Sequence, residues 1–339
     1  MSFTKTAGTD DEVAGERLAF DRLARERRGE IYLHCYRMLG ALSDAEDMTQ
    51  ETFTRAWRAR GEMTNDASGR NWLYRIATNV CLDALRRRKR ERRLWGDPAP
   101  NVAIADVGAP DLSVDWLEPM SDSMLSGMTD YRLSPHANYE QAETVRLAFL
   151  ACVQVLPARQ RAIFLLREVL GWSAAEVASA FAISVQAANS LLQRARRSFD
   201  TAYVREPKWT AASESDQQVA ERYAAALEKF DLDGFVALLH SDVALHMPPW
   251  RVWFTGPDAI RALLARLWQN YSGMRAHVFA ANGKTAIAVH VRMLGDDEWR
   301  PYNIQVLEVS EGAVISIVAF VGPLGATLFP KMGLPSEPA

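Results

Sequence analysis

Amide, hydroxyl and guanidinium side chains gather on one face of the helix predicted for residues 184–203. Apolar residues spaced three and four apart predict its buried stripe: Val185, Ala188, Leu192, Ala195 and Phe199. The opposite face carries polar and basic residues: Gln186, Asn189, Ser190, Gln193, Arg194 and Arg197. Amides and arginines hydrogen-bond base edges and phosphates, and a helix with such a face fits the major groove of DNA. The pattern therefore predicts a surface for nucleic acid.

A second basic surface is predicted on the helix expected over residues 71–93, which ends in the run RRRKRERR (86–93). Trp72, Ile76 and Val80 mark its core side, and Arg75, Asn79 and Arg86 share the other side. A solvated helix end would also favour cations. Seven cations in eight residues exceed that need, so nucleic acid is the favoured interpretation.

An acidic face is predicted on the helix of residues 44–60, where Ser43 and Glu46 have the spacing of a capping box. Asp47, Gln50 and Glu51 lie on one side of it, opposite part of the Phe53 and Trp57 stripe. From the residues alone this face is either solvated or a partner contact.

The elements around the polar and basic face of the helix at residues 184–203 have the order of a helix-turn-helix. Ser173 with Glu176 forms a second capping box and opens a short helix that runs to Phe181. A tight turn follows at residues 182–183, and Ser184 caps the next helix. A short helix, a tight turn and a second helix with a cationic face indicate this motif.

Charge and composition divide the chain into four parts. Residues 18–93 and 143–205 are the two helical modules, 94–142 is a linker rich in proline and acidic residues, and 214–330 is a tail domain. Net charges of +4, −7, +4 and −4 fall on residues 1–93, 94–142, 143–209 and 210–339. Two basic modules joined by an acidic linker suggest contact with a polyanion.

The tail is predicted as an α+β domain with two or three helices before a four-stranded meander over residues 276–320. Histidines and tryptophans could line a cavity in it: His246, Trp250, Trp253, Trp268, His290 and Trp299. A filled aromatic core is the simpler interpretation. Asp242 and His246 are four residues apart, but in a segment with strand character, so they make no convincing acid–base pair.

Several classes of protein are not expected. No apolar run approaches the roughly 18 residues of a membrane span, and the first residues lack a signal peptide's apolar segment. The three separated cysteines suit a reducing compartment and give no disulfide framework or zinc site. We expect a cytoplasmic protein without a cofactor, a metal or a catalytic residue.

These segments resemble two modules of the extracytoplasmic-function (group IV) sigma factors of the sigma-70 family. DAEDMTQETFTRAW (44–57) and NWLYRIATNVCLDALRRRKR (71–90) are similar to sigma region 2, and residues 156–197 are similar to the helix-turn-helix of region 4. The tail, with HMPPWRVWFTGPDAIRALL (246–264), is similar to SnoaL-like domains, which have the cone shape of nuclear transport factor 2. The implied fold is two all-α modules followed by an α+β cone.

The resemblance implies an alternative sigma factor that binds core RNA polymerase and promoter DNA. It implies polymerase contact for Asp47, Gln50 and Glu51. Contact with the minus-ten element is implied for Arg75, Asn79, Arg86, Arg87 and Lys89. Contact with the minus-thirty-five element is implied for Asn189, Ser190, Gln193, Arg194 and Arg197. In the family the linker threads the polymerase cleft, although Trp116, Leu117 and Met120 could instead clamp the modules onto the tail.

The tail is expected to modulate activity in cis, with or without a small ligand, in place of a separate anti-sigma protein. Enzymes with this fold use a carboxylate or histidine to abstract a proton, which keeps a SnoaL-like isomerase or hydrolase as one alternative. The other alternative is a helix-turn-helix regulator with a ligand-sensing tail. It predicts DNA affinity without polymerase.

Overall fold

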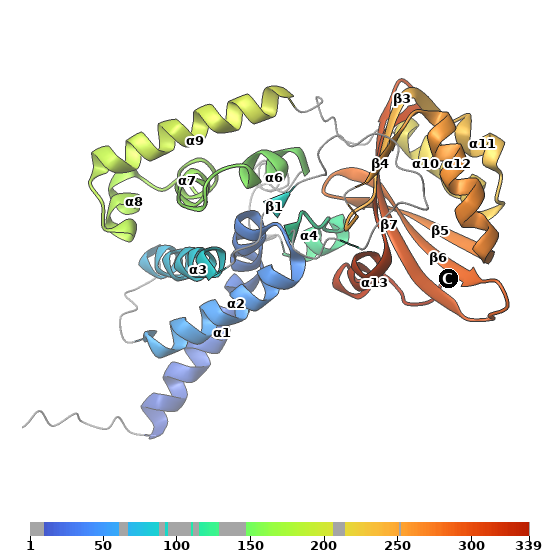
Figure 1. The fold of residues 1–339 in the computed structure, drawn as a ribbon. Helices are drawn as coiled ribbons and strands as arrows, with labels where there is room; N and C mark the ends of the chain where they lie inside the picture. Colours follow the sequence, from blue (N-terminus) through green and yellow to red (C-terminus); the bar gives the residue numbers. More distant parts are fainter. Residues whose placement is uncertain are drawn as a thin grey trace, which may run out of the picture.

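The computed structural model describes residues 10–60, 67–87, 92–93, 110, 115–128, 147–205, 214–250 and 252–338. Helices form the first part of the chain and a mixed sheet with helices forms the tail (Figure 1). The predicted fold class, two helical modules followed by an α+β domain, is confirmed. No helix among these residues is both long and apolar enough to cross a membrane.

The first module consists of α1 (Asp10–Leu39), α2 (Leu42–Arg58) and α3 (Ala67–Arg87). Gly40 ends α1 in the left-handed region at φ +70°, which favours glycine. Trp72 and Val80 of α3 are buried as expected. The predicted extension of this helix to residue 93 is wrong, because Arg92–Arg93 form a short strand, β1, that pairs with β2 (Asp115–Trp116).

The second module places two helices around a tight turn, as predicted. Its elements are α6 (Leu147–Gln154), α7 (Ala158–Phe164), the π-helical turn η3 (Leu165–Val169), α8 (Ala174–Phe181) and α9 (Val185–Arg205). Both hydrogen bonds of the Ser173–Glu176 capping box are present, and Ser184 Oγ accepts the N–H of Ala187 at 3.1 Å. The predicted burial of Val185 is wrong, because the buried stripe of α9 begins one turn later, at Ala188.

The tail contains a six-stranded sheet in the order β4-β3-β8-β7-β6-β5. The predicted meander corresponds to β5 (Tyr271–Ala281), β6 (Lys284–Met293), β7 (Trp299–Ser310) and β8 (Ala313–Phe320). The prediction missed β3 (Leu239–His246) and β4 (Trp253–Thr255) as members of this sheet. β3 joins the sheet by pairing in parallel with β8. This contact joins distant parts of the sequence, so a local residue pattern does not predict it.

Each face of this sheet has its own core. Three helices cover one face and enclose an apolar cluster that includes Phe235, Ile287 and Ile317: α10 (Glu214–Glu228), α11 (Leu232–Val236) and α12 (Pro257–Leu267). On the other face, residues such as Ala288 and Phe320 belong to the same cluster as the cores of the helical modules and α13 (Gly322–Lys331). The tail therefore shares a core with both modules, and α4 (Asp122–Met128) lies between them (Figure 1).

Candidate functional site

The acidic face of α2 is partly free and partly engaged. Asp47 and Gln50 are exposed. Gln50 Nε2 donates to Glu46 Oε1 at 2.9 Å, so its amide is oriented along the helix. Glu51 is half-buried and accepts a hydrogen bond from Arg55 Nε at 2.7 Å. Two of the three predicted partner residues are thus open to solvent, and the third is held by an arginine.

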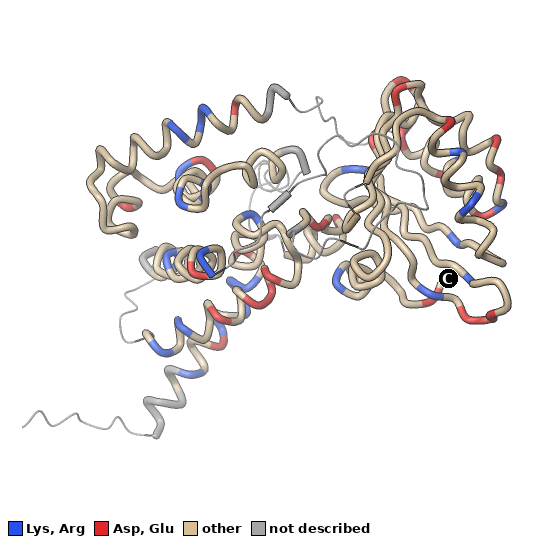
Figure 2. Tube along the Cα trace, in the orientation of Figure 1, with Lys and Arg blue, Asp and Glu red and all other residues tan. Residues whose placement is uncertain are grey.

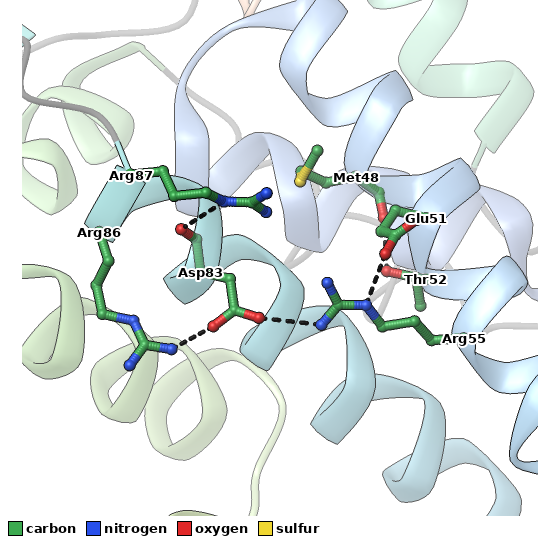
Figure 3. Close-up of polar contacts among 7 residues, drawn as sticks. All are labelled: Met48, Glu51, Thr52, Arg55, Asp83, Arg86 and Arg87. Carbon is green, nitrogen blue, oxygen red and sulfur yellow. Dashed lines mark hydrogen bonds and ion pairs between the residues drawn. The ribbon is translucent and has the colours of Figure 1, made fainter.

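Arg55 also connects this face to the basic surface of α3 (Figure 3). Its Nη1 lies 3.0 Å from Asp83 Oδ2, and Asp83 also pairs with Arg86. The hydrogen bond from Arg55, followed by that from Arg86, lowers the pKa of the Asp83 carboxyl. Glu51, Arg55, Asp83 and Arg86 therefore form one chain of alternating charge across the two helices.

The predicted basic surface of α3 is exposed. Arg75, Asn79, Arg86 and Arg87 all face solvent, and the first three recur on one side of the helix. Lys89 lies outside the described residues. Figure 2 shows lysine and arginine along α3 and α9, in modules that pack against each other. Arg86 is engaged by Asp83, whereas Arg75 carries its charge without an ion-pair partner among the described residues.

The predicted DNA-contacting face of α9, which we call its reading face, is exposed to solvent. Its side chains are Asn189, Ser190, Gln193, Arg194 and Arg197. Ala188, Leu192 and Ala195 are buried on the opposite side. Arg196 differs from its neighbour Arg194, because its Nη2 pairs with Glu168 Oε1 at 2.8 Å.

The two helical modules are joined through a buried arginine of the second. Arg161 of α7 donates to the carbonyl of Met38 at 2.6 Å, at the end of α1, and to the side chain of Gln154 at 2.6 Å. Gln154 Nε2 in turn donates to the carbonyl of Arg37 at 3.0 Å. Carbonyls at a helix C-terminus lack partners within the helix. The second module supplies those partners for α1.

The acidic linker enters this junction through Glu118, which is buried. The predicted Ser43–Glu46 capping box is wrong: α2 starts at Leu42, and the backbone N–H of Leu42 donates to Glu118 Oε2 at 2.7 Å. The cap therefore comes from a distant carboxylate rather than from the neighbouring serine. Trp116, Leu117 and Met120 are also buried, and Leu117 and Met120 belong to the core that the modules share with the tail.

The tail reaches the same junction through its β5–β6 turn. Asn282 has φ +51° and Gly283 φ +71°, which suits a tight hairpin turn. Asn282 Oδ1 accepts the N–H of Met120 at 2.7 Å, and the Asn282 N–H donates to the Met120 carbonyl at 2.9 Å. Tyr36 of α1 donates to the Glu118 carbonyl at 2.7 Å. First module, linker and tail therefore meet at one polar cluster.

A second contact from the tail comes from α13. Lys331 Nζ lies 3.0 Å from Ser43 Oγ and 3.4 Å from Glu118 Oε1. Burial raises the pKa of Glu118, and the nearby charge of Lys331 acts against that shift. We call Tyr36, Leu42, Glu118, Asn282 and Lys331 the junction cluster.

Sequence reasoning missed most of the junction cluster. The available signals were the Asn-Gly pair at 282–283 and one acidic residue among the apolar residues 116–120. Neither signal identifies the residue that is contacted, because these contacts join residues that are 76 to 246 positions apart in the sequence.

A cavity of about 50 Å³ lies between α10–α12 and the sheet. Apolar side chains from both the helices and the sheet line it, and its polar lining comes from five residues: Tyr223, Tyr271, Tyr302, Asn303 and Gln305. Of the six residues predicted for a tail cavity, Trp268 alone lines this one. Among the described lining residues there is no carboxylate or imidazole.

The other five predicted residues lie elsewhere. The rings of His246 and Trp253 are tilted at 55° to each other with their centroids 5.3 Å apart, and His290 contacts Phe329 of α13 on the opposite side of the sheet. Trp250 lies against Gly322. The guanidinium groups of Arg275 and Arg292 make cation–π contacts with the ring of Trp299. Desolvation lowers the pKa of His246 and of His290. These side chains therefore do not converge on one site.

Family models match three parts of the chain. A model of sigma-70 region 2 matches residues 23–91, one of sigma-70 region 4 matches 146–199, and one of the SnoaL-like domain matches 220–320. The crystal structure of the extracytoplasmic function sigma factor SigJ from Mycobacterium tuberculosis has the same fold, with a TM-score of 0.57 at 22% identity. That match covers 93% of this chain and 99% of the other.

Sequence relatives agree. SigJ is 29% identical over 237 residues, which are 67% of this chain and 64% of SigJ. The ECF RNA polymerase sigma factor SigG of Mycobacterium tuberculosis is 40% identical over 331 residues, which are 96% of this chain and 86% of SigG. The chain therefore belongs to the extracytoplasmic-function family of RNA polymerase sigma factors and carries a SnoaL-like domain at its C-terminal end.

Proposed function

We propose that this sigma factor binds core RNA polymerase in the cytoplasm through the acidic face of α2. Asp47 and Gln50 present a carboxylate and an amide to a basic, polar partner, and family membership supplies the partner's identity. Glu51 contributes by holding Arg55, whose second partner, Asp83, fixes α3 relative to α2. The polymerase surface and the basic surface of α3 then move as one body.

Promoter DNA is read by the two basic surfaces. On α3, Asn79 pairs with a base of the minus-ten element, and Arg75, Arg86, Arg87 and Lys89 contact phosphates. On α9, Asn189, Ser190, Gln193, Arg194 and Arg197 contact the minus-thirty-five element in the major groove. One observation carries this proposal: each module exposes amides and arginines on a helix whose opposite face is buried.

The tail modulates initiation in cis. Its support is the junction cluster, where Glu118 and Lys331 hold the start of the helix that carries Asp47 and Gln50. The modules are joined by Arg161 in this arrangement, and we propose that they separate when they bind the two promoter elements. A tail that stabilises the joined state limits initiation, and this contact in cis takes the place of a separate anti-sigma protein.

The tail works without catalysis. Proton transfer from a carbon acid needs a base near neutral pH, and the described lining of the cavity offers phenols, amides and apolar groups. Burial raises the pKa of Tyr223, Tyr271 and Tyr302, which keeps these phenols protonated. This lining favours binding over chemistry.

Run-off transcription with purified core polymerase tests the proposal. We expect the full chain to direct initiation from a cognate promoter, and deletion of residues 210–339 to raise the yield. DNA binding without polymerase at the same affinity would favour the helix-turn-helix regulator instead. Because this assay contains only the sigma factor and core polymerase, an effect of the deletion here would mean that the tail acts without a separate anti-sigma protein.

A further inference from the structure

Val185, the first residue of α9, is an exposed apolar side chain on a helix that the proposed function places in DNA. It is 45% exposed, although the apolar spacing of the helix predicts its burial. Other large apolar side chains that are similarly exposed among the described residues lie outside α9: Leu18, Val155, Met293 and Leu294. The exposure of Val185 therefore calls for a physical explanation.

The local structure shows that the core does not need Val185. Ile183, in the turn before α9, packs against the core of the helical modules, and the buried stripe of the helix begins at Ala188. Helical side chains lean toward the N-terminus of their helix, so a side chain at the first position projects past the end of it. Ser184 Oγ fixes this end by accepting the N–H of Ala187 at 3.1 Å. Val185 is thus presented to solvent on an ordered backbone.

The chemistry of valine suits a contact surface. Its branched Cβ restricts χ1, so little rotamer freedom is lost when a partner covers the side chain. Its methyl groups gain free energy when another apolar group removes them from water. Val185 is therefore prepared to contact an apolar group of whatever α9 binds.

The residues around Val185 limit which group of DNA that is. Residues 182–190 contain no charged side chain, and the first arginine of α9, Arg194, lies more than two turns further along. The commonest specific base contact, arginine or lysine to guanine, is therefore not available at this end of the helix. The N-terminal residues of a recognition helix contact base edges. The apolar group that the major groove displays is the C5-methyl group of thymine.

We propose that Val185 contacts the C5-methyl group of a thymine in the minus-thirty-five element and so selects an A·T pair there. This inference rests on the proposed function of α9. Asn189 is exposed one turn further along the same side of the helix, so Val185 extends the reading face to the start of α9. The contact buries one apolar group against another, without a hydrogen bond or a charge. Cytosine is disfavoured at this position because it lacks the methyl group.

Deoxyuridine tests the contact, since it pairs as thymine does and lacks only the methyl group. The holoenzyme, reconstituted from the full chain and core polymerase, first selects its minus-thirty-five element from random DNA. Each thymine of that element, on either strand, is then replaced singly by deoxyuridine, and the affinity of the holoenzyme is measured at fixed salt. We expect one replacement to weaken binding about fourfold, the effect of losing one buried methyl group.

Two valine variants locate the contact. Val185→Ala should remove the sensitivity at that position, so that the thymine and deoxyuridine DNAs bind equally. Val155→Ala makes the same change at a valine that is 51% exposed, between α6 and α7, and should keep the fourfold difference. Both side chains are exposed, so both variants should fold, and their unfolding midpoints establish this.

Four results would overturn the assignment: an element without thymine on either strand, no position sensitive to deoxyuridine, a sensitivity that Val185→Ala leaves intact, or one that both variants remove. In each of these cases the holoenzyme still selects an element, so the proposed function stands. A holoenzyme that selects no minus-thirty-five element contradicts the proposed function, and the contact falls with it. A sensitivity that Val185→Ala alone removes supports the contact.

Discussion

The carboxylate of Glu118 accepts the backbone N–H of Leu42 at 2.7 Å, so a linker residue begins a helix of the first module. Lys331 of the tail lies 3.4 Å from the other oxygen of that carboxylate. A charge-assisted hydrogen bond to a helix N-terminus is favoured by the helix dipole as well as by the unpaired N–H. One buried carboxylate thus connects three parts of the chain.

Replacing Glu118 with Gln should lower the free energy of unfolding by about 2 kcal/mol, since the bond to Leu42 loses its charge. Lys331→Met should cost less, because Lys331 is partly exposed. Urea unfolding of both variants and of the double variant gives the coupling, which we expect at about 1 kcal/mol. Strictly additive effects would show that the two side chains do not interact.

Arg194→Ala should weaken promoter DNA binding by about 1–3 kcal/mol at fixed salt, because this exposed side chain contributes to the reading face of α9. Arg196→Ala is the matched control, since Arg196 is paired with Glu168. The measurement is affinity for promoter DNA in complex with polymerase. Equal losses in the two variants would assign the effect to net charge rather than to the reading face.

Asp47→Lys should weaken association with core polymerase about tenfold or more by placing like charge against a basic partner. Asp21→Lys makes the same charge change at an exposed position of α1, outside the proposed surface. Fluorescence titration of labelled protein with core polymerase compares them. A similar affinity for both variants would remove the acidic face of α2 from the interface.

Stability should fall as the pH is lowered, because of His34. This imidazole is buried, and its Nε2 lies 2.9 Å from Thr78 Oγ1, whose hydroxyl donates to the Tyr74 carbonyl. Desolvation, followed by the charge of Arg37, lowers the pKa of His34 from 6.5 to about 3. Between about pH 6.5 and pH 3, His34 is protonated in the unfolded chain but stays neutral in the folded chain. The free energy of unfolding therefore falls as the pH is lowered through this range.

The expected loss from His34 between pH 7 and pH 5 is about 2 kcal/mol. Urea unfolding at both pH values should show it, and His34→Gln, which cannot titrate, should reduce the difference by that amount. An unchanged pH dependence in the variant would mean that other groups are responsible.

Gly325→Ala should destabilise the tail by about 3 kcal/mol, since the added Cβ would clash with the Phe320 carbonyl and lie 2.7 Å from the Tyr302 carbonyl. Gly127→Ala in α4 adds the same group where no atom lies within 4 Å. Thermal unfolding should separate the two variants clearly. Equal midpoints would show that α13 moves aside at little cost.

Local patterns were sufficient to locate the two helices of the helix-turn-helix. The Ser173–Glu176 box and the stripe of Ala188, Leu192 and Ala195 are set by neighbours within one or two turns, so their spacing predicts both the elements and the exposed faces. The same reasoning failed at Ser43, where the spacing was right but a distant carboxylate took the N-terminus of the helix.

The tail cavity was harder to predict because its lining depends on which alternate residues of each strand face the helices. His290 and Val289 are adjacent, yet only Val289 faces the cavity, and the bulge at Tyr302 shifts the alternation in β7. Counting aromatic residues could not reveal this phase. The selection of Trp268 succeeded, whereas the place of Asn303 depends on the pairing of the strands.

The contact between Ser43 and Lys331 also has a consequence for synthesis on the ribosome, since 288 positions separate the two residues. At about 5–20 residues per second, the lysine emerges roughly 15–60 seconds after the serine. During that interval the nascent first module has α2 without its partner from α13. A newborn chain therefore passes through a period in which α2 is accessible before its contact with Lys331 of the tail has formed.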